Sequence, residues 1–167
     1  MIRSIEDFNN AWKYESESTV KVFDHLTQES LDQRVTPEGR SLGFLAWHII
    51  TTLTEMPGSA GLAVEGPQHG TPAPDLAEEF SSTYRSTSEA LVKSINENWN
   101  DEMLTDTLTM YGQDGWTYGM VLRALIDHQI HHRGQMTVLM RQAGLRVPGV
   151  YGPAREDWAS MGMEAMP

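Results

Sequence analysis

Four long segments of the chain repeat apolar residues at helical spacing, and this pattern constrains the fold more than any other feature. Each segment opens with a residue type that commonly caps a helix, namely Ser4, Ser41, Asp75 and Thr117. The apolar residues recur every three or four positions, as they do when one face of a helix is buried. Four such helices bury their apolar faces against one another. The sequence therefore predicts an all-α protein built as a four-helix bundle.

Turn and cap residues predict where these helices end. The first helix should continue for about seven turns and end before the segment TPEGR. Pro57 and Gly58 should end the second helix, and the third should end near Asn98. Gly144 suits the position just after the fourth helix, and a last short helix is expected to begin near Pro153.

Two connections between the helices have their own signals. Residues 58–74 form a long connection rich in proline and glycine near its end, which leaves room for a crossover between the second and third helices. The segment LTDTLTMYGQDGWTYG alternates apolar and polar residues around the turn residues GQDG. This alternation predicts a short strand or hairpin before the fourth helix.

Composition excludes several classes of function. The chain has 23 acidic and 12 basic residues, a formal net charge of −11, and no basic cluster, so neither nucleic acid nor an anionic membrane is an expected partner. No apolar run approaches the ~20 residues of a membrane span, and the N-terminus MIRSIEDFNN lacks the apolar run of a signal peptide. We expect a cytoplasmic protein with a single domain over residues 1–167.

The chain contains no cysteine. Disulfides, thiolate ligands and a cysteine nucleophile are therefore all excluded. Any bound metal must be held by nitrogen or oxygen, and any thiol chemistry must use a thiol that comes from outside the protein.

The stretch DHQIHHRGQ places three of the six histidines within five residues. His128 and His132 are four apart, so both imidazoles lie on one face of the predicted fourth helix and can reach one metal ion. His48 lies in the apolar run GFLAWHII, where a buried imidazole needs a partner. Counting ~1.5 Å per residue from each helix start places all three near the middle of the bundle. Spacing thus predicts a metal site of His48, His128 and His132.

Interpretations that involve no metal site compete with this prediction. A single buried histidine such as His48 is more often a core residue whose ring is hydrogen-bonded within the protein. A histidine pair at this spacing often occurs without binding a metal. His131 lies about 100° round the helix from His132, so it should support the site or lie at the surface, with a smaller chance of replacing a ligand. His25 and His69 have no ligand spacing, and we assign them no role.

The motif HHRGQM, with a further histidine four residues before its second one, resembles the DinB-like (DinB/YfiT) superfamily of metal-dependent proteins. SLGFLAWHI and VPGVYGP strengthen the resemblance, which extends from Ile5 to Asp157. It implies a four-helix bundle with up-down-down-up winding, a homodimer, and a three-histidine metal site at the positions of His48, His128 and His132.

The motif's other residues, and some outside it, have candidate roles. Gly134 costs roughly 1 kcal/mol against alanine within a helix, which makes sense if a neighbouring helix approaches closely there. Gln135 could orient a ligand by hydrogen bonding, or cap a loop carbonyl. The polar stretch 15–19 could line the mouth of the site or be exposed to solvent. Glu55 lies ~10 Å along its helix from His48, too far for a convincing general base. Trp12, Trp47 and Tyr84 could form pocket walls, although core packing is the more common role for such residues.

The resemblance implies an activity as well. Characterised members of the superfamily are thiol-dependent S-transferases or isomerases in which the metal binds a low-molecular-weight thiol such as bacillithiol, mycothiol or glutathione. We therefore expect an S-transferase acting on a small-molecule substrate, with zinc or nickel as the divalent ion. A metal-dependent hydrolase, a non-catalytic metal-binding stress-response or small-molecule-binding module, and a purely structural ion are the alternatives. No catalytic acid or base stands out.

Overall fold

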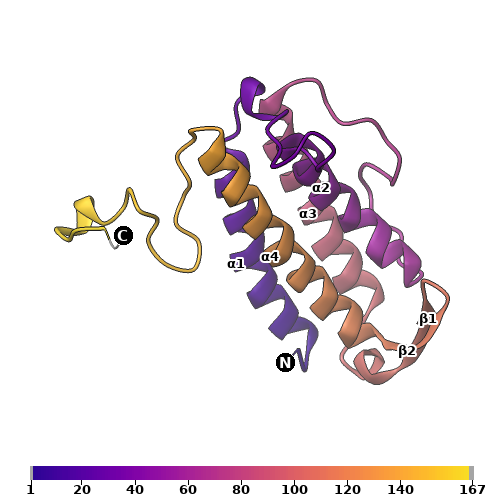
Figure 1. The fold of residues 1–167 in the computed structure, drawn as a ribbon. Coiled ribbons are helices and arrows are strands. Elements are labelled where there is room, and N and C mark those ends of the chain that lie inside the picture. The colour runs from indigo at the N-terminus through magenta and orange to yellow at the C-terminus, as the bar shows by residue number, and fades with distance from the viewer. Residues whose placement is uncertain (1, 166–167) are drawn as a thin grey trace.

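Long α-helices dominate the computed structural model, which describes residues 2–165 (Figure 1). A two-stranded antiparallel sheet precedes the last long helix, and three short 3-10 turns lie between or after the helices. The prediction of a mostly helical protein with four long helices is confirmed for this part of the chain. The helices are α1 (Ile5–Phe23), α2 (Leu42–Ser59), α3 (Ala77–Asn98) and α4 (Tyr118–Gln142), and the strands are β1 (Thr107–Met110) and β2 (Gln113–Thr117).

Side-chain caps fix the start of three helices as predicted. The hydroxyl groups of Ser4, Ser41 and Thr117 each accept a hydrogen bond from a backbone N–H in the first turn, at 3.0, 3.1 and 3.2 Å respectively. The predicted cap at Asp75 is wrong. Helix α3 begins two residues later, where the Glu79 carboxylate accepts a hydrogen bond from the N–H of Leu76 at 3.3 Å.

Two helix ends also differ from the prediction. Helix α1 ends at Phe23, so it is shorter than the expected seven turns, and a 3-10 turn follows at Gln28–Ser30. Helix α2 continues through Pro57 to Ser59. The carbonyl of Pro57 accepts hydrogen bonds from the N–H groups of Ala60 and Leu62, and these bonds close the helix.

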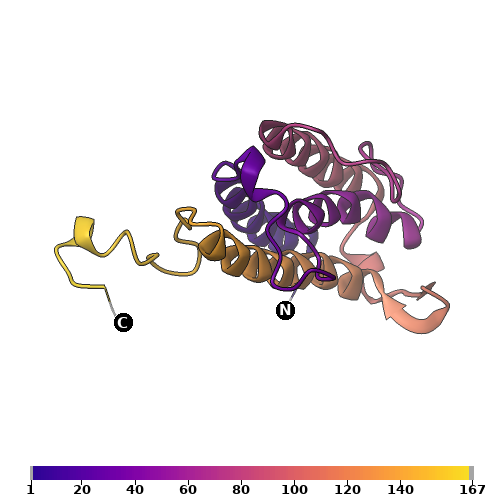
Figure 2. The same cartoon turned by 45° about the horizontal axis from the view of Figure 1, so that its top comes forward.

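The hairpin before α4 is confirmed, with Leu108 paired to Trp116. Its turn lies at Tyr111 and Gly112, both at positive φ. Of the predicted turn residues GQDG, only Gly112 belongs to this turn. The tail after α4 contacts α1 through Val150 and Tyr151, and its end then extends away from the helices (Figure 2). Instead of a helix beginning at Pro153, the tail contains a 3-10 turn at Ala159–Met161.

The core lies where α1 and α2 each pack against both α3 and α4. Helix α2 contributes the most continuous apolar surface, as its sequence predicts, and the largest buried side chains fill the space between the helices. No helix within residues 2–165 combines the length and the hydrophobicity that crossing a bilayer requires. The largest fully buried side chains are Trp12, Tyr84, Phe8, Phe23, Phe80, Leu42, Ile49, Ile50, Leu53, Leu91, Ile95 and Met110.

Candidate metal centre

The three predicted histidines meet where α2 faces α4. The Nε2 atom of His128 lies 3.2 Å from Nε2 of His48 and 3.1 Å from Nε2 of His132. One ring nitrogen from each of the three lies within 4.8 Å of the others. Two nitrogens bound to one tetrahedral ion at 2.0–2.1 Å would be about 3.3 Å apart. The cluster is therefore close to the size that an ion needs and could hold one.

Hydrogen bonds to the far side of two rings favour metal binding through Nε2. Nδ1 of His132 lies 2.7 Å from Oε1 of Gln135, and Nδ1 of His128 lies 3.5 Å from the hydroxyl oxygen of Thr52. An Nδ1–H that donates to an oxygen leaves the Nε2 lone pair free for an ion, as in many metal sites. The predicted orienting role of Gln135 fits this geometry, since its side-chain oxygen can accept a hydrogen bond from the ring of a candidate ligand.

Electrostatics keep the cluster neutral. Burial is the largest cause that lowers the pKa of His48 to about 4, and the positive charges of His132 and Arg40 lower it further. Burial, followed by the charges of His132 and His48, lowers the pKa of His128 to about 3. Burial also lowers the pKa of His132, although its hydrogen bond to Gln135 acts in the opposite direction. Neutral imidazole is the form that binds metal, so the cluster is ready for an ion at neutral pH.

His131 does not join the cluster. Its ring lies 4.7 Å from that of His132, centroid to centroid, and its side chain is exposed. The expectation of a supporting or surface position for His131 matches this placement. His25 uses Nδ1 to contact the backbone carbonyl of Lys21, and His69 is exposed in the connection between α2 and α3.

A cavity of about 370 Å³ lies beside the cluster, between residues 35–45 and the last turns of α4. Gln135, which contacts His132, lines it from α4, and Arg40 lines it from the preceding loop. The Arg40 guanidinium lies over the ring of Phe44 at 5.2 Å, and that ring stacks on His48 with centroids 6.0 Å apart. The three histidines do not line the cavity themselves: Gln135 connects it to His132, and Arg40 connects it to His48 through Phe44.

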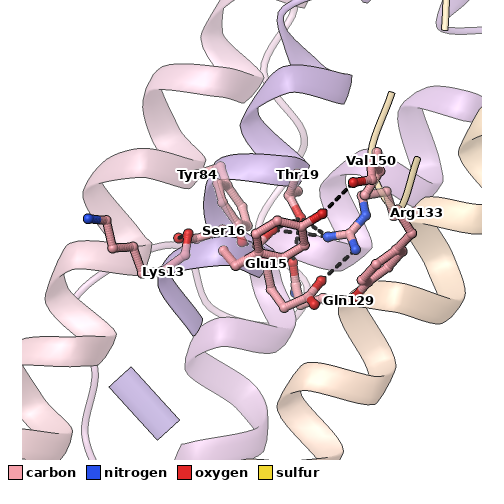
Figure 3. A network of polar contacts seen from close by, with 10 residues as sticks. Lys13, Glu15, Ser16, Thr19, Tyr84, Gln129, Arg133 and Val150 are labelled. Atoms are coloured by element: carbon pink, nitrogen blue, oxygen red, sulfur yellow. Dashed lines mark hydrogen bonds and ion pairs between the residues drawn. The ribbon is translucent and has the colours of Figure 1, made fainter. Parts of the chain in front are cut away.

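A buried polar network occupies the other side of α4 (Figure 3). Nη2 of Arg133 lies 2.5 Å from the Glu15 carboxylate, and both side chains are almost fully buried, with 3% and 7% exposed. Arg133 also donates to the hydroxyl oxygen of Thr19, and that hydroxyl and the Tyr84 hydroxyl both contact the side-chain oxygen of Gln129. The inward residues of the polar stretch 15–19 therefore bind α4 instead of lining a site mouth, whereas Glu17 is exposed to solvent.

Several other predicted roles are settled by the structure. Trp12 and Tyr84 are buried in the core, whereas Trp47 is half-buried and donates from Nε1 to the carbonyl of Thr71. The Tyr111 hydroxyl donates to the Glu55 carboxylate at 2.9 Å, which ties the hairpin to α2. The close helix approach inferred at Gly134 is wrong for the described chain, since a Cβ there would meet no atom within 4 Å.

Two parts of the site region were not predicted from the sequence. The pairing of Glu15 with Arg133 joins residues 118 positions apart, and only the polar gap in an amphipathic segment signals it. The place of Arg40 beside the histidines depends on the path of a loop, for which the sequence has no periodic signal.

These features define a helical protein with a three-histidine cluster between two of its helices, beside a small cavity. The model of the DinB family matches residues 1–165. The chain is also 40% identical to the uncharacterized protein YrdA of Bacillus subtilis strain 168, over 99% of this chain and 98% of that protein. The chain belongs to the DinB family.

Solved structures agree with this assignment. A DinB-like protein from Bacillus cereus ATCC 10987 has a TM-score of 0.85 and 44% sequence identity, and the match covers 90% of this chain and all of that one. The DinB-like protein YjoA from Bacillus subtilis has a TM-score of 0.63 at 19% identity, over 82% of this chain and 91% of that one. At that identity the second match is evidence for the fold alone.

Proposed function

We propose that this protein is a divalent-metal-dependent enzyme, specifically an S-transferase that uses a low-molecular-weight thiol. The observation that carries the proposal is the convergence of His48, His128 and His132, whose ring nitrogens lie within 4.8 Å of one another. Within residues 2–165 no carboxylate or fourth protein ligand joins the three imidazoles, and such a donor set is typical of a catalytic site with an open position. Zinc or nickel suits such a donor set.

The residues of the chain would hold the ion and bind the reactants around it. Nε2 atoms of the three histidines are the proposed ligands, with Gln135 and Thr52 fixing the rings from behind. A divalent ion held there would supply Lewis acidity, which lowers the pKa of a thiol bound to it. The thiol must come from outside, since the chain has no cysteine.

The proposed transfer is a nucleophilic substitution at carbon. The thiol loses its proton to solvent, its sulfur forms a bond to an electrophilic carbon, and the bond from that carbon to the leaving group breaks. The leaving group departs with the electron pair. The half-buried positions of His48 and His128 leave access for two small reactants, and the adjoining cavity offers room for one of them.

Two alternatives use the same site. A metal-dependent hydrolase would use water in place of the thiol, and a non-catalytic module would bind a metal or a small molecule without turnover. We also propose, on the family resemblance, a cytoplasmic homodimer with up-down-down-up winding of its helices. The long connection between α2 and α3 supports that winding.

Metal content tests the site first. Purified untagged protein should contain about one divalent ion per chain by mass spectrometry, and His48→Ala, His128→Ala and His132→Ala should each lose it. His131→Ala is the matched control, because this exposed neighbour should be dispensable for the ion. No ion in the wild type after reconstitution with zinc or nickel would refute the metal-dependent proposal.

Activity then separates the three functions. The metal-loaded protein should join bacillithiol, mycothiol or glutathione to a chromogenic aryl halide, and the three alanine variants should lose this rate. Hydrolysis of model esters without a thiol would favour the hydrolase. Metal binding without either reaction across these panels would favour the non-catalytic module.

A further inference from the structure

The cavity beside the histidines has apolar walls and one charged group. Buried Leu45 and Leu139 form its inner surface. Val35 and Val138 lie on its two sides and are 68% and 54% exposed. Apolar surface of this kind around a small cavity commonly marks a ligand site.

Arg40 is the cation of this cavity, and it is free. Within residues 2–165 its guanidinium has no carboxylate within ion-pair distance, although the chain as a whole is strongly acidic. The loop that carries it is ordered by its own contacts. Arg34 donates to the carbonyl of Gly39 at 2.6 Å, and the N–H of Gly39 donates to the carbonyl of Thr36 at 2.9 Å. The guanidinium is thus held over Phe44 with its donors available to a ligand.

We propose that this cavity binds the electrophilic substrate as an apolar monocarboxylate, with the carboxylate on Arg40 and the apolar body between Val35 and Val138. The inference rests on the proposed function, since it assigns the second reactant of the same site. Guanidinium pairs well with a carboxylate in two parallel hydrogen bonds. A single cation balances one negative charge, which favours a carboxylate over a phosphate dianion.

The spacing along α4 sets the length of the substrate. Gln135 and Leu139 line the cavity three and seven residues beyond His132, about 5 to 10 Å along the helix axis. An apolar body of about this length would therefore fit in the cavity along α4, beyond the level of His132. The apolar walls suit such a body better than they suit the polar low-molecular-weight thiols, so the cavity is assigned to the other reactant.

Binding of an unreactive probe tests the assignment. Octanoate and its neutral analogue octanamide are titrated into the metal-loaded protein, with affinities measured by NMR. Octanoate should bind more tightly than octanamide, and Arg40→Gln should weaken octanoate about tenfold while octanamide is unchanged. Arg40→Lys should retain part of the affinity. Arg3→Gln makes the same charge change at the start of α1, and it should have no effect.

Two results would overturn the inference. Octanoate binding that is equal in the wild type and in Arg40→Gln would remove the role of Arg40. Binding that depends on His128 but not on Arg40 would place the carboxylate on the metal ion instead. Val138→Glu, an exposed position where folding is secure, should repel octanoate and provides a second check.

These experiments distinguish a failure of the cavity assignment from a failure of the proposed function. Metal content and thiol transfer with a neutral aryl halide report on the histidines and do not require Arg40. If metal content and thiol transfer are normal but octanoate binding does not depend on Arg40, only the cavity assignment is refuted. Absence of metal, together with octanoate binding that depends on Arg40, would refute the enzyme and leave a carboxylate-binding protein.

Discussion

Replacing Arg133 with methionine should destabilise the protein strongly, because it leaves a buried carboxylate without its main partner. Arg133 donates to the Glu15 carboxylate at 2.5 Å, to the Glu15 backbone carbonyl at 3.0 Å and to the Thr19 hydroxyl oxygen at 3.1 Å. The Tyr151 hydroxyl, which also contacts the carboxylate, would be its one remaining side-chain donor among the described residues. Methionine keeps most of the volume of the side chain but none of its donors.

The expected loss is about 3–5 kcal/mol in the free energy of unfolding, the usual cost of removing one member of a buried ion pair. For a chain of this size, 1 kcal/mol corresponds to about 2–4 °C in Tm. The variant should therefore melt roughly 6 to 20 °C below the wild type. Glu15→Gln combined with Arg133→Met should lose less than the sum of the two single changes, since the buried charge is then removed together with its partner.

Urea unfolding followed by circular dichroism measures the free energy, with Arg123→Met as the matched control. Arg123 pairs with Asp127 on the same helix, but these side chains are 58% and 51% exposed, so its removal should cost less than about 1 kcal/mol. Equal, small losses in the two variants would refute the reasoning. They would mean that the Glu15 carboxylate regains solvation when Arg133 is removed.

Two further predictions follow from the region of the site. Gly134→Ala should stabilise the protein by about 0.5–1 kcal/mol in urea unfolding, because the added methyl group meets no atom within 4 Å; destabilisation would instead indicate a contact with a second chain. In metal-free protein, folding lowers the pKa of His48 to about 4 and of His128 to about 3, below the unfolded value of ~6.5. The unfolded chain then binds more protons, so stability should be full above pH 6.5 and fall as the pH decreases towards 4. His128→Gln should flatten this dependence, and parallel curves for the variant and wild type would contradict it.

Local signals predicted most of the helical framework. Ser4, Ser41 and Thr117 start their helices as expected because an N-cap acts within one turn. At the start of α3, a contact distant in sequence contributes to the error. The start of α3 depends in part on the Gln28 side chain, whose oxygen accepts a hydrogen bond from the N–H of Ala77 at 3.0 Å. No pattern within the third segment could have revealed that contact.

The candidate site was predictable to the extent that helix geometry determines it. His128 and His132 share a face because they are four residues apart, and the central position of His48 in its helix brings it to the same level. The cavity and its free guanidinium depend on how the loop before α2 packs on the end of α4. Arg40 has no spacing that marks it, so only the three-dimensional structure places it beside the histidines.

Helix α4 carries two neighbouring rows of polar side chains, and the second row fixes the helix that carries the histidines of the first. Gln129 and Arg133 each follow one histidine of the pair on α4, and they form hydrogen bonds to α3 and α1 respectively. Gln129 also donates to the carbonyl of Ile49 at 3.5 Å, next to His48. Core contacts therefore set α4 against the turn of α2 that carries His48. On the proposed function, an ion at a site positioned in this way would add little to the free energy of unfolding, as expected of a reactive rather than a structural ion.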